Sequence, residues 1–145
     1  MRSIEFFDRG HDLGPARTCI VDGASEYSFA EVKALTERVA RALHANGFAN
    51  QDQIALYGPN SADMLVVLLS IWRANGKWIP VNLRNAADAN ISYLDYVGCQ
   101  WLFYHSSLAE QVKTLRANCP QLTHFVCLDR ELDGDPSLQQ FIEGH

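Results

Sequence analysis

The sequence has 145 residues, of which 48% are hydrophobic and 20% charged, and its formal net charge is -5. A chain of this size buries roughly two-thirds of its unfolded surface in one core, so we expect a single compact domain. Lysine and arginine are scattered singly through an acidic chain, which disfavours a nucleic acid as a partner.

The sequence carries no sign of a membrane span or an export signal. The longest apolar run, residues 64–72, contains Ser70 and falls short of the ~20 apolar residues that cross a bilayer. The N-terminus has acidic residues and lacks the apolar core of a signal peptide. We therefore expect a cytoplasmic protein whose four cysteines are reduced thiols.

The first third of the chain predicts a hairpin followed by a helix. Residues 18–28 form two short β-prone runs around an Asp-Gly turn. The sequence from Ser28 to Glu31 matches a capping box, in which each of these two side chains bonds to the backbone amide of the other. Apolar residues then recur at helical spacing, and Gly47 suits a left-handed end, which predicts a helix over about 29–46.

The middle of the chain predicts a strand, a buried helix and a second strand. Residues 53–57 are apolar and precede Gly-Pro, and Asn60 or Ser61 can cap an apolar helix over 62–74. A strand is expected at 78–81. Its proline has no N–H for a ladder and must lie at a sheet edge or a strand end.

The last third repeats the alternation of helix and strand. We expect a helix at 88–97, an aromatic strand at 100–104, a helix begun by a second capping box, Ser107 to Glu110, and a strand at 123–128. The sequence after Asp129 is acidic and rich in turn formers. We accordingly assign residues 1–129 to one α/β subdomain, and 130–145 to an exit loop and the truncated start of a next segment.

This alternation predicts an α/β fold with a mainly parallel sheet, helices on both faces and the opening hairpin at one edge. Familiar site motifs are missing, since the sequence has no GxGxxG, no GxxxxGK[ST], no GxSxG and no HExxH. His124 and Cys127 are three residues apart on a predicted strand and point to opposite faces, which argues against a metal site with Cys119. The aromatic residues of the predicted sheet and of the apolar helix could form a stacking platform, but they are interpreted as core side chains; they are Trp72, Trp78, Trp101, Phe103 and Tyr104.

One turn lies where open α/β sheets bind anions, at the carboxyl end of a strand and the start of a helix. It runs from Tyr57 through Gly-Pro-Asn to Ser61. Every strand–helix turn shares this geometry, so a structural turn capped by Asn60 or Ser61 is the stronger interpretation.

Three segments, taken in order, resemble the N-terminal part of the adenylate-forming superfamily, which includes acyl-CoA synthetases, aryl-CoA ligases, luciferases and nonribosomal adenylation domains. They are Tyr27-Ser-Phe-Ala-Glu-Val32, Gln53-Ile-Ala-Leu-Tyr-Gly-Pro-Asn-Ser61 and Arg73-Ala-Asn-Gly-Lys-Trp-Ile-Pro-Val-Asn-Leu-Arg84. The resemblance spans about residues 6–129. Departures occur at Asn75 and Gly76, where the family usually has Gly and Ala, and at Leu83, where it usually has Pro.

The resemblance implies the N-terminal subdomain of the acyl-CoA synthetase fold, from an enzyme that activates a carboxylic acid, here expected to be a fatty acid, as an acyl-adenylate and transfers it to CoA. It also implies ATP and Mg²⁺ for the parent enzyme, held by a Ser/Thr/Gly-rich loop and lysines that lie beyond residue 145. We therefore expect no catalytic residue and no metal ligand in this chain.

Arg84 matches the arginine of the family's Asn-Pro-Arg, which lies at the mouth of the CoA site in some CoA ligases, and a guanidinium suits a CoA phosphate. A solvated arginine after a strand is the simpler interpretation.

Two other functions are compatible with the sequence. A free-standing module could keep this fold for binding or interaction without the chemistry, and an unrelated flavodoxin-like domain ranks last because the sequence shows no flavin-phosphate loop. The expected partners are the remainder of the parent ligase and, through it, a small carboxylic acid and CoA. An isolated chain is also expected to self-associate through apolar surface that the remainder would cover.

Overall fold

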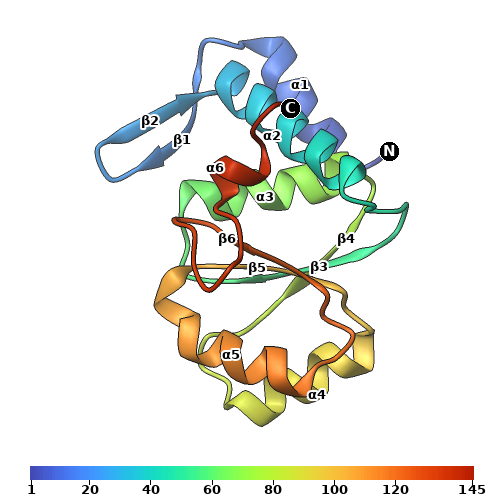
Figure 1. Cartoon of the computed structure of the whole chain (residues 1–145). Helices are drawn as coiled ribbons and strands as arrows, with labels where there is room; N and C mark the ends of the chain where they lie inside the picture. The colour runs from blue at the N-terminus through green and yellow to red at the C-terminus, as the bar shows by residue number, and fades with distance from the viewer.

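A four-stranded parallel sheet forms the centre of the computed structural model, which describes residues 1–145 (Figure 1). Its strands, in spatial order, are β4 (Lys77–Pro80), β3 (Gln53–Tyr57), β5 (Trp101–Tyr104) and β6 (His124–Cys127). The expected parallel sheet is confirmed, and β4 begins and ends one residue earlier than the sequence predicts. The proline of β4 does lie on an edge strand, as its missing N–H requires.

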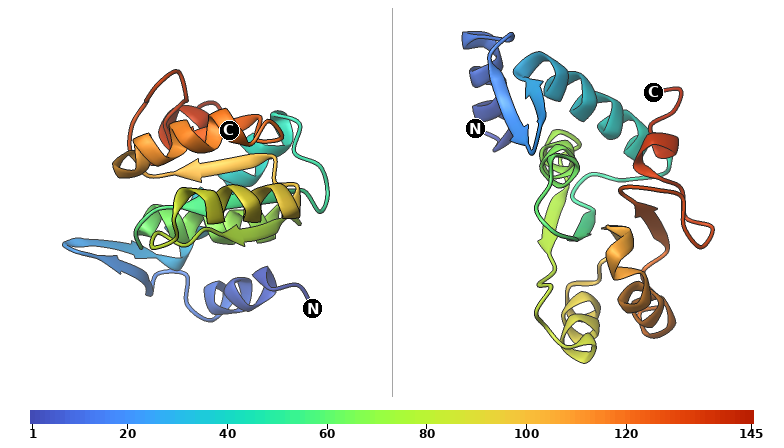
Figure 2. Two further views of the ribbon diagram at one scale, coloured as in Figure 1. Left: turned by 90° about the horizontal axis from the view of Figure 1, so that it is seen from below. Right: turned by 90° about the vertical axis from the view of Figure 1, so that its left-hand side faces the viewer.

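Helices cover both faces of this sheet (Figures 1 and 2). On one face lie α2 (Phe29–Ala45) and α3 (Ala62–Arg73), with α1 (Ile4–Leu13) and α6 (Leu138–Phe141) packed beside them. On the other lie α4 (Ala87–Val97), the 3₁₀ turn η1 (Ser106–Leu108) and α5 (Ala109–Asn118). The helices at 29–46, 62–74 and 88–97 are therefore confirmed within one residue at each end.

The side chains of each inner strand alternate between two apolar cores. On β3, Ile54 and Leu56 pack with α2 and α3, whereas Ala55 packs with α4 and α5. Trp101 and Leu102 of β5 divide in the same way. This two-sided burial explains why the strands are continuous apolar runs and not an alternation of apolar and polar residues.

The opening hairpin forms a sheet of its own. Its strands β1 (Thr18–Asp22) and β2 (Ser25–Ser28) pair antiparallel around a two-residue turn. The expectation that it joins an edge of the central sheet is wrong, because no ladder connects it to β4 or β6. The carboxylate of Asp22 instead accepts a hydrogen bond of 2.8 Å from the Ala62 amide, which fixes the hairpin to the start of α3.

Of the two capping boxes expected from the sequence, the first is confirmed and the second is wrong. The Glu31 amide donates to the Ser28 hydroxyl over 3.2 Å, and the Glu31 carboxylate accepts from the Ser28 amide over 2.7 Å. Ser107 caps no α-helix, because its amide and hydroxyl both bond to the His105 ring. The Glu110 carboxylate pairs with a lysine one turn further along α5.

The sequence patterns missed helix α1, which long-range contacts hold in place. Its Asp8 accepts a 2.7 Å hydrogen bond from the Arg73 guanidinium of α3. The same guanidinium donates to the Thr36 hydroxyl of α2 over 3.0 Å. One arginine, only 16% exposed, thus joins three helices, and such contacts cannot be read from a local pattern.

Residues 130–145 fold back against the sheet edge at β6. The Cys127 amide donates to the Pro136 carbonyl over 2.9 Å, and a buried carboxylate, Asp135, accepts from the Tyr104 hydroxyl over 2.8 Å and pairs with Arg116. The short helix α6, absent from the sequence expectations, places Leu138 in the core. The division of the chain at residue 129 stays a prediction. No helix has both the length and the apolar character needed to cross a membrane.

Candidate functional site

The carboxyl ends of the four parallel strands meet at one edge of the sheet, where open α/β sheets bind ligands. Polar residues follow each strand directly. They are Asn60 and Ser61 after β3, Asn82 and Arg84 after β4, His105 and Ser106 after β5, and Asp129 after β6. This carboxyl edge is the candidate site.

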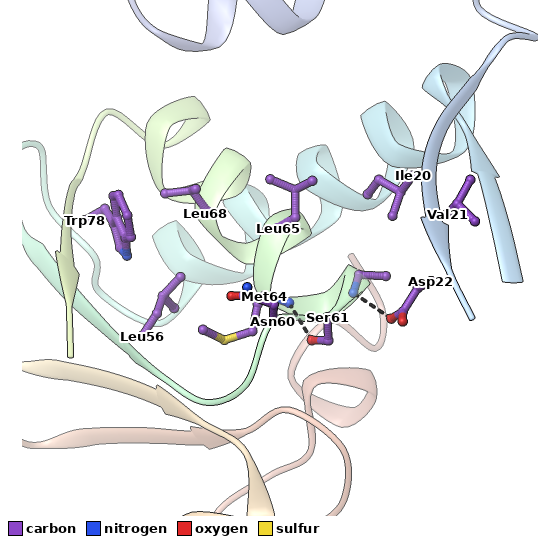
Figure 3. Close-up of a pocket in the computed structure, with 11 residues that line it drawn as sticks. Ile20, Val21, Asp22, Leu56, Asn60, Ser61, Met64, Leu65, Leu68 and Trp78 are labelled. Carbon is purple, nitrogen blue, oxygen red and sulfur yellow. Dashed lines mark hydrogen bonds between the residues drawn. The ribbon is translucent and has the colours of Figure 1, made fainter. Parts of the chain in front are cut away.

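The turn after β3 is a capped structural turn, as its stronger interpretation predicted. Ser61 is the N-cap of α3, and its hydroxyl accepts from the Met64 amide over 3.2 Å. The Ala62 amide donates to the Asp22 carboxylate of the hairpin, and Figure 3 shows both bonds side by side at the start of α3. Because the chain's own side chains accept these amides, they are not open to an external anion.

A histidine and an aspartate join the turns after β5 and β6. Nδ1 of His105 accepts from the Ser107 amide, so the ring proton lies on Nε2, 3.7 Å from the Asp129 carboxylate. Asp129 accepts from the Ser106 hydroxyl over 2.6 Å and from the Ser106 amide over 2.9 Å. Gly58 permits the close approach of the β3 turn, since a Cβ there would lie 3.0 Å from the His105 Cβ.

These contacts determine the charge of Asp129. Burial alone would raise the pKa of its carboxyl group, but the hydrogen bonds from Ser106 and the neighbouring His105 hold that pKa well below its usual range. Asp129 is therefore ionised at neutral pH and acts as a fixed acceptor. Nδ1 of His105 also lies 2.8 Å from the Ser107 hydroxyl, and the His105 side chain is the N-cap of η1.

Asp63, in the first turn of α3, adds a further carboxylate to this edge. Its side chain reaches solvent, yet surrounding protein atoms partly desolvate it and raise its pKa. The negative charges of Asp22 and Asp129 raise that pKa further, while His105 acts in the opposite direction. An edge with three carboxylates is electrostatically unfavourable for a bare polyphosphate.

Arg84 lies in the exposed connection between β4 and α4. Its backbone amide donates to the Asn82 side chain over 2.8 Å, which shapes the turn. Its guanidinium takes part in none of the ion pairs of the chain. The residue is thus free to contact a ligand or a neighbouring segment, and its role at CoA stays a prediction.

Histidine, cysteine and acidic side chains are dispersed over the structure. No group of three or more histidine, cysteine, aspartate or glutamate side chains is close enough to hold a metal ion. Of the three residues considered for a metal, His124 stacks on Trp101 with ring centroids 3.9 Å apart, and Cys119 and Cys127 are buried.

The sequence patterns missed His105, Asp129, Asp22 and Asp63 as members of one edge. A usable signal was present, because His105 and Asp129 each follow a predicted apolar strand within two residues. The carboxyl ends of parallel strands lie together, so polar residues at those positions become neighbours across 24 residues of sequence. Asp22 was interpreted only as a turn residue, and its bond to Ala62 depends on tertiary contact.

Comparisons with known proteins agree with this architecture. The family described as AMP-binding enzyme matches residues 7–143. The indoleacetate–CoA ligase of Aromatoleum aromaticum is 29% identical over 143 residues, covering 99% of this chain and 28% of that protein. The chain therefore spans little more than a quarter of this curated relative.

Solved structures share the fold at low sequence identity. A benzoate CoA ligase from Burkholderia xenovorans LB400 superposes with a TM-score of 0.87 at 14% identity, covering 99% of this chain and 28% of that one. The N-terminal domain of FACL13 from Mycobacterium tuberculosis gives a TM-score of 0.86 at 23% identity, with coverages of 99% and 36%.

Proposed function

Because the chain belongs to the family of AMP-binding enzymes, the adenylate-forming ligases, we propose that it is the N-terminal α/β part of an ATP-dependent acyl-CoA synthetase. The observation that carries this proposal is the match over residues 7–143, which includes nearly the whole chain. Two features support it: the fold shared with acid–CoA ligases, and the order of the three sequence segments that resemble the superfamily.

The proposed reaction has two steps. A carboxylate oxygen of the acid attacks the α-phosphorus of ATP, and pyrophosphate leaves, giving an acyl-adenylate. The sulfur of a thiol, here CoA, then attacks the acyl carbon; the S–H proton is released, AMP leaves, and acyl-CoA is formed. Enzymes of this family use Mg²⁺ with ATP, which neutralises phosphate charge during the first step. We propose a fatty acid or a similar carboxylic acid as the substrate.

Within such an enzyme, residues 1–145 provide scaffold and not chemistry. The amides at the start of α3 are capped by Asp22 and Ser61, and the carboxyl edge is acidic. We therefore assign the nucleotide and Mg²⁺ to later residues of the ligase, and we expect the isolated chain to be inactive. The alternative is a free-standing module with the same fold that binds a partner without chemistry.

The first test is to sequence the source gene beyond the codon for His145. A Thr-Ser-Gly-Thr-Thr-Gly-x-Pro-Lys-like loop within a few dozen codons is expected for the ligase, whereas a stop codon before it favours the free-standing module. The second test is ATP–pyrophosphate exchange with a panel of fatty and aromatic acids. The whole gene product should catalyse acid-dependent exchange, and exchange by residues 1–145 alone would contradict their proposed role.

A further inference from the structure

An apolar groove crosses the face of the molecule between the hairpin and the edge strand β4. It has a volume of about 460 Å³ and runs along α3 (Figure 3). Trp78 of β4 lies at one end, Val21 of β1 lies at the other, and Leu65 of α3 lies between them. These three side chains are 40%, 65% and 40% exposed. Large apolar side chains gathered in this way mark an interaction surface.

The groove lies at the one sheet edge that the chain leaves open. Both faces of the sheet are covered by helices, and residues 130–142 fold back along β6 at the opposite edge. No segment of the chain covers the outer edge of β4, and the hairpin forms a separate sheet away from this strand (Figure 2). A two-stranded hairpin is marginally stable alone, so it too gains from further packing.

The backbone of β4 favours packing of side chains over the addition of another strand. The amides of Lys77 and Val81 both donate toward β3, and in a parallel ladder Ile79 shares this orientation. The backbone nitrogens of Trp78 and Pro80 therefore point away from β3, and that of proline has no hydrogen to donate. The outer edge thus offers a single amide donor, which is too little to template a ladder.

The chemistry of the groove also disfavours an acid or a phosphate ligand. Its only ionisable side chain is Asp22, whose carboxylate already accepts from the Ala62 amide. A second negative charge placed beside it would be repelled. The groove therefore suits an uncharged, apolar surface.

We propose that this groove is the surface on which the remainder of the ligase polypeptide docks through apolar side chains. The inference rests on the proposed function, under which most of the enzyme lies outside these residues, since the chain spans 28% of the indoleacetate–CoA ligase. That polypeptide must pack against this part of the fold, and the groove is apolar, open and next to the uncovered strand.

Carbene footprinting with mass spectrometry tests the docking, comparing the 145-residue chain with the whole ligase. Labelling of Trp78 and Leu65 should fall at least fivefold in the whole ligase. A second readout uses Val21→Lys, which alters a 65% exposed side chain and should leave the melting temperature of the short chain within about 2 °C. The same substitution should lower the melting temperature of the whole ligase by more than 5 °C. Tyr96→Lys, on α4 at 89% exposure, is the matched control.

The outcomes separate this inference from the proposed function. A whole ligase that is active in exchange but labels equally at Trp78 in both forms overturns the docking surface alone. Loss of labelling in the short chain at high concentration, with dimers in light scattering and an exposed Trp78 in the whole ligase, identifies a second copy as the occupant and also overturns it. A gene product without acid-dependent exchange overturns the proposed function whatever the footprint shows.

Discussion

Replacing Asp129 by alanine removes the acceptor that joins the turns after β5 and β6. Its carboxylate is 24% exposed and accepts from both the hydroxyl and the amide of Ser106. A hydrogen bond to a charged group contributes about 1.5 kcal/mol or more when buried, and solvent at this partly exposed carboxylate weakens it, so the two bonds together predict a loss of about 2 kcal/mol. For a chain of this length the loss corresponds to a decrease in melting temperature of about 6 °C.

The pH dependence of this loss follows from the low pKa of Asp129. A carboxyl group whose pKa is lower in the folded than in the unfolded state stabilises the fold above its unfolded value, about 4. That contribution is lost as the pH falls from about 4 through the folded value. The difference in unfolding free energy between the parent chain and Asp129→Ala should therefore shrink as the pH falls below 4.

Urea denaturation followed by circular dichroism at pH 7, 5 and 3.5 measures this difference. Asp95→Ala is the control, because that carboxylate is exposed on α4 and takes part in no ion pair. It should change the unfolding free energy by less than about 0.5 kcal/mol. The reasoning is refuted if Asp129→Ala matches this control at pH 7, or if its effect does not shrink between pH 5 and pH 3.5.

Three further predictions concern other contacts of the chain. Ser28→Ala should lower the unfolding free energy by about 1 kcal/mol in urea denaturation, because it removes the N-cap of α2, whereas Ser25→Ala in the exposed hairpin should have little effect. Asp8→Asn should lower it by about 2 kcal/mol, since it leaves the largely buried Arg73 guanidinium without its carboxylate, and an unchanged urea midpoint would contradict this. In the whole ligase, Arg84→Ala should raise the KM for CoA about fivefold while acid-dependent ATP–pyrophosphate exchange, which needs no CoA, stays unchanged; equal effects on both would exclude a CoA contact.

Local sequence patterns predicted the elements whose residues stabilise one another within a few positions. The hairpin, the capping box of α2 and the apolar strands β3 and β5 belong to this class. Helix α1 does not, because its place depends on the pairing of Asp8 with Arg73, 65 residues away. The cap after β5 was missed for another reason. Ser107 and Glu110 fit a capping box, but the amide and the hydroxyl of Ser107 both bond to the His105 ring instead.

The residues of the candidate site also divide into those that sequence can identify and those that only tertiary contacts bring together. Arg84 was identified through a resemblance in sequence, and the structure leaves its guanidinium without an ion pair. His105 and Asp129 became neighbours only because β5 and β6 pair in parallel, which no short window of sequence contains. Tertiary pairing therefore decides which polar residues share the carboxyl edge.

The way in which polar groups are satisfied indicates where this chain meets other molecules. At the carboxyl edge, Asp22 accepts from an amide of α3, and Asp129 accepts from Ser106, so these groups already have partners within the chain. A ligand there would have to replace bonds that the fold needs. The Arg84 guanidinium has no ion-pair partner, and the exposed apolar side chains of the groove beside Trp78 are uncovered. Contacts with CoA and with the rest of the ligase are therefore expected at Arg84 and at the apolar side chains of the groove, and not at the amides that Asp22 and Ser61 cap.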